Sequence, residues 1–214
     1  MKQDLSYLRQ NYIKGQINFD SLPENPMDLF SIWYNEASEN KNILEPNAMS
    51  LSTTEQDGFP RSRVVLLKEF NAQGFIFYTN YASQKGIAIE KNPKVGLTFF
   101  WLELEQQILI KGTASKVSKE TSEEYFYKRP FESQIGAMVS NQSSVIDIHS
   151  NLDEFAQNLQ NKYENQIVPK PETWGGYLVK PTEFEFWQGR PSRLHDRIRY
   201  QLQESKWKQE RLSP

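Results

Sequence analysis

The fold is decided by the stretch RVVLLKEFNAQGFIFYT, residues 63–79. It holds two runs rich in β-branched and aromatic residues, 63–70 and 75–79, separated by the turn sequence NAQG at 71–74. Two such runs on either side of a glycine-containing turn are typical of a β-hairpin. The stretch therefore predicts two neighbouring antiparallel strands.

Further strands are predicted on both sides of this hairpin. Residues 48–54 precede it across the turn signal Asp57-Gly58. The same composition returns later in the chain, at residues 95–102, 107–117, 174–180, 184–188, 198–203 and 205–214. Many short strands joined by hairpins favour an antiparallel barrel over a doubly wound parallel sheet.

Helices are predicted around these strands. Pro26 suits a first helical turn, and the following apolar residues fall at helical spacing on one face: Leu29, Phe30, Trp33, Tyr34 and Ala37. Four more helices are predicted at residues 83–92, 118–128, 132–140 and 151–165. We expect a mobile N-terminal arm over residues 1–25 and one domain over 26–214. The predicted class is mainly β with α (α+β), antiparallel, with helices packed around the barrel.

The composition restricts which functions the protein can have. The chain has 214 residues and no cysteine, so disulfides and thiolate metal sites are excluded. No secretory signal and no apolar run of membrane-spanning length occurs, so we expect a cytoplasmic protein. The 25 basic and 27 acidic residues nearly balance, which argues against a nucleic-acid binder, although a local basic patch stays possible. The usual nucleotide and zinc motifs do not occur.

The run FWQGRPSRLHDR, residues 186–197, is the densest functional signal. Gly189 and Pro191 exclude a regular helix here, so the segment is a shaped loop. Its arginines suit the bidentate capture of phosphate or carboxylate, and His195 is one of only two histidines. The alternative is a cluster of salt bridges with acids such as Asp196.

Three further segments carry possible anion sites. Residues 61–68 are predicted to form an apolar strand that is buried on both faces and has cations at its ends, where anions could bind. The alternative is an ordinary amphipathic strand whose cations reach into solvent. Ser83 is a suitable helix N-cap beside Lys85, and a capped helix start can bind an anion. Tyr125, Arg129 and Ser133 are spaced by four, so their polar tips converge if the helix continues through Pro130.

The loop Asn141-Gln142-Ser143-Ser144 adds hydrogen-bond donors after the last of these segments. The segments together hold more phosphate donors than one phosphate needs, which favours two phosphorylated ligands. No cysteine nucleophile, paired acids or Ser-His arrangement is evident. A chain with two anion sites and few acid–base groups suggests that a cofactor supplies the chemistry.

The motifs, taken in order, resemble the pyridoxamine 5′-phosphate oxidase family over almost the whole chain. They are RVVLLK at 63–68, FYTN at 77–80, Arg129-Pro130 with SQIGA at 133–137, QSS at 142–144, WGG at 174–176, FWQG at 186–189 and RLHDR at 193–197. The resemblance implies an FMN-binding split β-barrel and a homodimer with FMN at the interface. It also implies oxidation of pyridoxamine or pyridoxine 5′-phosphate to pyridoxal 5′-phosphate, with O2 as acceptor, H2O2 as product and ammonia released from the amine.

The resemblance also implies roles for individual residues. The implied FMN contacts are Arg63, Val64, Val65, Leu66, Leu67, Lys68, Tyr78, Thr79, Gln84, Lys85, Gln107, Gln142, Ser143, Trp187 and Arg197. The implied substrate contacts are Arg9 and Tyr12 in the arm, Lys68, Tyr125, Arg129 and Ser133 around the phosphate, and Arg193 and His195 over the reacting C4′ as catalytic groups.

One position departs from the family pattern. Members often carry a basic residue directly before the lysine that corresponds to Lys85, and this chain has Gln84. We expect FMN still to bind because Arg63 and Lys85 remain. Two other functions stay open on the same fold: another split-barrel flavin oxidoreductase, and a non-catalytic carrier of flavin or pyridoxal phosphate.

Overall fold

The computed structural model describes residues 3–8 and 10–214. The chain falls into two compact units. The first comprises Met1–Ser50, Gly96–Lys111 and Pro181–Pro214, and the second comprises Leu51–Val95 and Gly112–Lys180. The predicted boundary between a mobile arm and a single domain stays a prediction.

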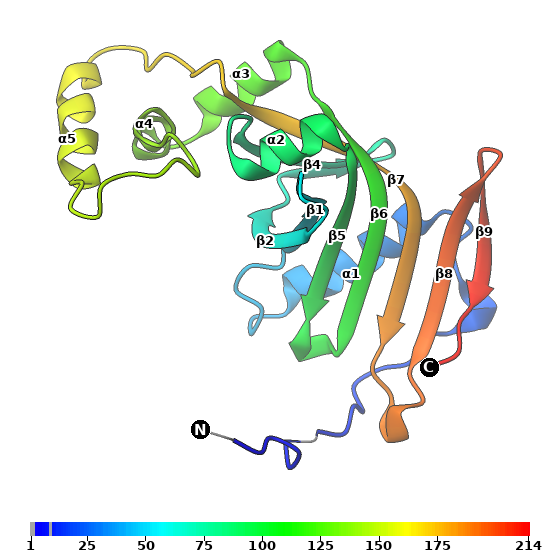
Figure 1. Ribbon diagram of the computed structural model, residues 1–214. Helices are drawn as coiled ribbons and strands as arrows, with labels where there is room; N and C mark the ends of the chain where they lie inside the picture. Colours follow the sequence, from blue (N-terminus) through cyan, green and yellow to red (C-terminus); the bar gives the residue numbers. More distant parts are fainter. Residues whose placement is uncertain (1–2, 9) are drawn as a thin grey trace. The chain divides into compact units, whose positions relative to one another are not determined.

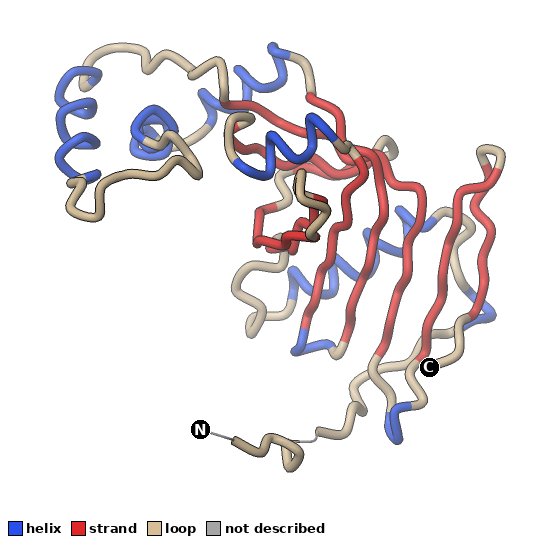
Figure 2. Tube along the Cα trace, in the orientation of Figure 1, coloured by secondary structure: helices blue, strands red, loops and turns tan. Residues whose placement is uncertain are grey.

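Strands dominate the described chain, with helices inserted between them (Figures 1 and 2). The strands are β1 (Ala48–Thr54), β2 (Pro60–Leu66), β3 (Glu69–Asn71), β4 (Gly74–Asn80), β5 (Lys94–Trp101), β6 (Gln106–Lys116), β7 (Trp174–Gln188), β8 (Asp196–Gln203) and β9 (Lys206–Arg211). The α-helices are α1 (Pro26–Glu39), α2 (Gln84–Lys91), α3 (Lys119–Lys128), α4 (Phe131–Val139) and α5 (Leu152–Tyr163). Short 3-10 helices occur at Phe19–Ser21, Leu102–Leu104 and Pro191–Arg193.

Hydrogen bonds join the strands in the order β2-β1-β5-β6-β7-β4-β3, with β8 on β7 and β9 on β8. The pairs β3–β4, β4–β7, β7–β8 and β8–β9 are antiparallel. The predicted hairpin is confirmed, because Asn71 pairs with Gly74 across the turn and Gly74 adopts a φ of 143° that glycine tolerates best. The antiparallel, mainly β class with added helices is therefore confirmed.

Two strand predictions were wrong in their bounds. The predicted strand 63–70 is interrupted, since β2 ends at Leu66 and β3 begins at Glu69. The predicted break inside 174–188 is absent, and β7 runs straight through Pro181. That is possible because β7 pairs with β4 up to Val179 and with β8 from Glu183, so the missing N–H of Pro181 falls between these two ladders.

The expectation that residues 61–68 are buried on both faces was also wrong. Val64 is 70% exposed, whereas Leu67 is 3% exposed. The reason is the place of β2 at one end of the strand order, where one side of the strand lacks a neighbour.

In the first unit, α1 packs one apolar face onto the strands. The side-chain oxygen of Asn25 caps its N-terminus by accepting from the N–H of Met27 at 3.0 Å. Phe30 meets Phe99 edge-on at 5.2 Å between ring centroids, and Trp33 meets Phe186 at 5.3 Å. Phe99 belongs to β5 and Phe186 to β7, and Figure 1 shows α1 running across these strands.

In the second unit, α3, α4 and α5 follow one another between β6 and β7 (Figure 1). A buried cluster of Phe126, Ile135, Val168 and Trp174 joins these helices to the start of β7. In the described residues no helix is long and apolar enough to cross a membrane. The cytoplasmic location stays a prediction.

Candidate functional site

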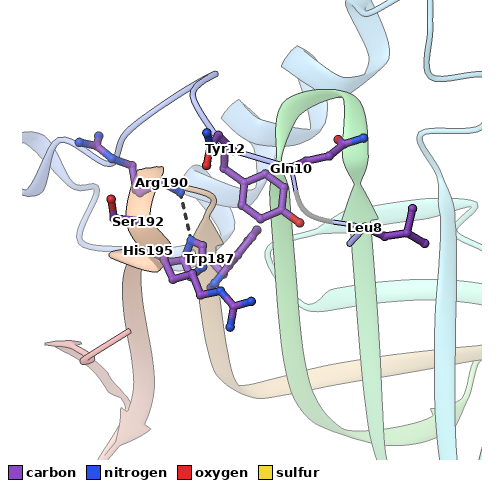
Figure 3. A pocket seen from close by; sticks show the side chains of 9 residues that line it. Leu8, Gln10, Tyr12, Trp187, Arg190, Ser192 and His195 are labelled. Atoms are coloured by element: carbon purple, nitrogen blue, oxygen red, sulfur yellow. Dashed lines mark hydrogen bonds between the residues drawn. The ribbon is translucent and has the colours of Figure 1, made fainter. Parts of the chain in front are cut away.

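A cavity of about 630 Å³ lies in the first unit. Its lining residues come from the N-terminal arm and from the loop between β7 and β8: Leu8, Gln10, Asn11, Tyr12, Trp187, Arg190, Ser192, Arg193 and His195. Figure 3 shows the rings of Tyr12, Trp187 and His195 gathered at this cavity. The structure thus brings together Tyr12, Trp187, Arg193 and His195, four of the residues singled out in the sequence.

The loop that carries Arg193 has an unusual backbone. Ser192 and Arg193 adopt positive φ angles of 57° and 62°, which non-glycine residues rarely do. Gly189 lies against the arm, because a Cβ built there would stand 2.8 Å from Cβ and Cγ of Tyr12. The strained turn and the close approach shape the cavity wall. From Gly189 and Pro191 the sequence predicted only a shaped loop in place of a regular helix.

His195 has a defined hydrogen bond inside this cavity. Its Nδ1 accepts from the backbone N–H of Arg190 at 3.1 Å (Figure 3). The imidazole lies 4.7 Å from the Trp187 ring and 5.7 Å from the Tyr12 ring. Burial, and secondly the charge of Arg193, lower the pKa of His195 below its ordinary 6.5. Neutral His195 therefore carries its proton on Nε2.

The other arginines of the loop are held by acids. Asp196 is buried and receives Arg190 at 3.6 Å, Arg211 at 3.4 Å and the backbone N–H of Ile17 at 3.2 Å. Arg197 pairs with Glu185 at 2.8 Å and donates to the carbonyl of Ser213 at 2.7 Å. Part of the segment is thus the salt-bridge cluster considered as the alternative. Arg193, by contrast, has no carboxylate partner among the described residues.

A second cationic site lies in the second unit around Lys85. The ammonium donates to Gln142 Oε1 at 2.9 Å and to Thr79 Oγ1 and Ser83 Oγ at 3.2 Å each. Ser83 caps α2 as predicted, accepting from the N–H of Gly86. Burial, and secondly the charge of Arg63, lower the pKa of Lys85 to about 8. Lys85 and Arg63 are thus two cations without a carboxylate partner among the described residues, close to the N-terminus of α2. This arrangement favours binding of an anion beside Lys85.

A cavity of about 330 Å³ opens beside this cluster, in the same unit. Its lining combines polar groups with aromatic rings: Tyr78, Thr79, Asn80, Arg129, Ser133, Gly136, Ala137, Ser140, Gln142 and Trp174. Thr79 and Gln142 thus belong both to the cavity wall and to the Lys85 cluster, while Arg129 and Ser133 form another part of the wall. Residues far apart in sequence therefore meet at this cavity.

The geometry expected for Tyr125, Arg129 and Ser133 was wrong, however. Arg129 has φ −76° and ψ 150° and ends α3, and Pro130 caps α4, so no single helix carries the three side chains. Tyr125 does not line the cavity but stacks on Tyr78 at 3.9 Å. Burial raises the pKa of Tyr78 to about 12, so its hydroxyl stays protonated at neutral pH.

The remaining predicted residues lie as follows. Arg63 donates to Thr53 Oγ1 at 2.7 Å and to the carbonyl of Leu51 at 3.2 Å. Lys68 is exposed after β2, Ser143 is exposed at a positive φ of 72°, and Gln107 is half-buried in β6. Gln84 faces a different hollow, with Glu55 and Asp57. Val65 and Leu66 are half-buried in β2, and Arg9 lies outside the described residues.

Some lining residues had no predicted role. Asn80, Ser140 and Trp174 line the smaller cavity. Arg190, one of the arginines of the 186–197 loop, lines the larger one. The signal that could have found Asn80 and Trp174 was their place in the motifs FYTN and WGG.

Comparisons of the whole sequence with known proteins show the family. Residues 37–171 match the family described as "Pyridoxamine 5′-phosphate oxidase", and residues 174–214 match the "Pyridoxine 5′-phosphate oxidase C-terminal dimerisation region". A protein of Christiangramia forsetii named pyridoxine/pyridoxamine 5′-phosphate oxidase is 50% identical, over all of both chains. One of Flavobacterium johnsoniae with the same name is 52% identical, over 98% of this chain and 99% of the relative.

Solved structures extend the comparison to the fold. PhzG from Burkholderia lata, in complex with tetrahydrophenazine-1-carboxylic acid, is similar with a TM-score of 0.87 and 28% identity, over 94% of this chain and 100% of that one. An FMN-binding protein from Nostoc punctiforme shares the fold, with a TM-score of 0.69 at 14% identity, over 90% of this chain and 100% of that one. The chain therefore belongs to the pyridoxamine 5′-phosphate oxidase family of FMN-dependent split-barrel oxidoreductases.

Proposed function

We propose that this protein oxidises pyridoxine 5′-phosphate and pyridoxamine 5′-phosphate to pyridoxal 5′-phosphate, as a homodimer. The observation that carries the proposal is the pair of cations around one cavity system, Lys85 and Arg129, neither of which has a carboxylate partner among the described residues. Two uncompensated cations suit two phosphates, one on the cofactor and one on the substrate. The relatives' names supply the substrate class.

The residues around Lys85 fit the phosphate of FMN. The cluster offers the Lys85 ammonium, the hydroxyls of Thr79 and Ser83 and the side-chain amide of Gln142. The Arg63 guanidinium lies close enough to lower the pKa of Lys85. These are the groups that a phosphate monoester requires. When bound, FMN would accept a hydride from C4′, and dioxygen would then reoxidise the flavin and be reduced to H2O2.

Arg129 and Ser133 are proposed to hold the substrate phosphate. The Arg129 backbone is fixed at both ends, since its N–H donates to Phe126 at 3.2 Å and its carbonyl accepts from Gln134 Nε2 at 2.9 Å. Nη1 of Arg129 is buried without a protein partner, so a donor remains for a phosphoryl oxygen. By binding the phosphate at one end of the substrate, Arg129 and Ser133 orient the pyridine ring. They take no part in the chemical step itself.

Arg193 and His195 are proposed to act at the reacting end of the substrate. Arg193 lines the 630 Å³ cavity, and its charge is not cancelled by any acid of the described chain. Neutral His195 can donate from Nε2 to the substrate, because its Nδ1 is already engaged by Arg190. Both residues are therefore placed to orient and polarise C4′ and its substituent, beside the rings of Tyr12 and Trp187.

Steady-state kinetics of the FMN-loaded protein tests the proposal. With pyridoxine 5′-phosphate we expect aldehyde and H2O2 in equal amounts, and with pyridoxamine 5′-phosphate also ammonia. Arg193→Leu should lower kcat/KM roughly a hundredfold with FMN still bound, because a preorganised donor at the reacting end is lost. Full activity of that variant would refute the role of Arg193.

Arg129→Leu gives the matched test at the other end. It should raise KM roughly tenfold or more and change kcat little, because it removes substrate binding rather than chemistry. An unchanged KM would contradict the phosphate site. Absence of turnover in the wild-type protein, with FMN bound, would instead support the carrier.

A further inference from the structure

Trp174 stands at a junction that the proposed mechanism does not use. It is the first residue of β7, pairs with Asn80 of β4 and is 7% exposed. Its backbone is fixed on both sides, since its N–H donates to the carbonyl of Pro171 at 3.0 Å and its own carbonyl accepts from Lys170 Nζ at 3.1 Å. The backbone of Trp174 is thus held by groups of the protein itself.

The two glycines after Trp174 allow β7 to approach its neighbours closely. A Cβ on Gly175 would stand 2.2 Å from the hydroxyl of Tyr81, and one on Gly176 would stand 2.8 Å from the ring of Tyr78. Because no side chain intervenes, the Trp174 and Tyr78 rings lie nearly parallel, with centroids 5.5 Å apart at 12°. Tyr125 continues the stack at 3.9 Å from Tyr78.

The guanidinium of Arg129 lies over this indole. Its Cζ is 4.7 Å from the centroid of Trp174 and 5.7 Å from that of Phe126. In the part of the chain that the structure describes, no acid pairs with this guanidinium. A carboxylate would occupy the N–H donors of Arg129, whereas an aromatic face attracts the cation and leaves those donors free.

We propose that Trp174 is a positioning residue that holds the Arg129 guanidinium, by its ring face, in the orientation that binds the phosphate of the substrate. This inference rests on the proposed function, in which Arg129 binds that phosphate. By positioning Arg129, Trp174 then contributes to the preference for phosphorylated over unphosphorylated substrates.

The test compares KM with kcat for pyridoxine 5′-phosphate in FMN-loaded W174L and W174F. Cation–π energies predict that W174L raises KM roughly three- to thirtyfold, with kcat within about twofold of wild type. W174F, which keeps a ring face, should recover most of the loss. In an R129Q background, W174L should change KM by less than about twofold, because the partner cation is gone.

V168A is the matched control for loss of packing. Val168 is 2% exposed in the same buried cluster and is not placed against Arg129. V168A should lower Tm and leave KM unchanged. The inference is overturned if W174L leaves KM unchanged, if the same rise persists with R129Q, or if W174L lowers only Tm and FMN content as a packing defect would. If W174L does not fold, W174F is compared in the wild-type and R129Q backgrounds instead. We expect W174F to raise KM about twofold when Arg129 is present and not to raise it in R129Q.

Failure of the proposed function can be told apart from failure of this inference. If wild type binds FMN but does not turn over, calorimetric titration with pyridoxal 5′-phosphate replaces kinetics as the readout. Weaker binding to W174L than to wild type and V168A, with W174F between them, would still support the role of Trp174. Equal binding to all four proteins would overturn it.

Discussion

The backbone N–H of Arg190 donates to Nδ1 of His195 at 3.1 Å, and this hydrogen bond fixes which imidazole nitrogen can face a ligand (Figure 3). Protonation of Nδ1 would break the bond, because an N–H cannot accept from an N–H. The side chain is therefore kept as a neutral donor through Nε2. Arg190 is itself paired with Asp196, so the loop backbone that makes the bond is anchored.

The first prediction concerns the titration of His195. In an H149Q background, where His195 is the only histidine, NMR of the ring should give a pKa below 6.5, since burial and Arg193 disfavour the cation. As the pH falls, His195 of the unfolded chain binds a proton at a higher pH than His195 of the folded chain. Protonation of His195 therefore lowers the stability of the folded protein as the pH falls below 6.5. R193Q should raise the pKa. A pKa at or above 6.5 in the H149Q protein would contradict the assignment.

The second prediction concerns Lys85 and FMN affinity. The pKa of Lys85 is lowered to about 8, so the free protein carries this charge below pH 8 and loses it above. The FMN phosphate is fully ionised in that range. The Kd for FMN should therefore rise by up to about tenfold per pH unit above pH 8.

Fluorescence titration of the flavin-free protein measures this dependence, and K85R supplies the control. Arginine stays charged throughout, so its Kd should be nearly constant from pH 7 to 10. The same steep rise in K85R would show that another group is responsible.

The third prediction concerns Gly189. G189A places a methyl group 2.8 Å from the Tyr12 side chain, so the arm must move away from the cavity. We expect kcat/KM to fall roughly tenfold or more, as is usual when a positioning group is displaced by about 1 Å. The double variant G189A/Y12G should be no worse than Y12G, because glycine at position 12 removes the Cβ that the new methyl group would meet. Additive losses would mean that Gly189 acts on something other than Tyr12.

The fourth prediction concerns the stability of the loop anchor. D196N keeps an acceptor for the N–H of Ile17 but loses the charge that binds Arg190 and Arg211. The Asp196 side chain is only 10% exposed, so we expect a loss of about 1–2 kcal/mol, or roughly 2–8 °C in Tm. E124Q breaks the exposed Glu124–Lys128 pair and should change Tm very little. Equal shifts in both variants would argue against an anchoring role.

The sequence predicted those features that local patterns determine. The hairpin at residues 63–79 and the Ser83 cap needed only a few neighbouring residues, and both are confirmed. The continuity of β7 through Pro181 could not be predicted, because it depends on pairing with β4 and β8, which are distant in the chain. Arg129 and Ser133 were predicted together on an incorrect helical geometry, since the chain leaves the helical path at Arg129 and Pro130, yet both side chains line one cavity. The contact of Arg129 with Trp174 had no local signal at all.

The most direct test of the central claim is the visible spectrum of the FMN-loaded protein before and after pyridoxine 5′-phosphate is added without oxygen. We expect a flavin spectrum that bleaches on addition and returns when air is admitted. A flavin spectrum that persists unchanged at saturating substrate would contradict it.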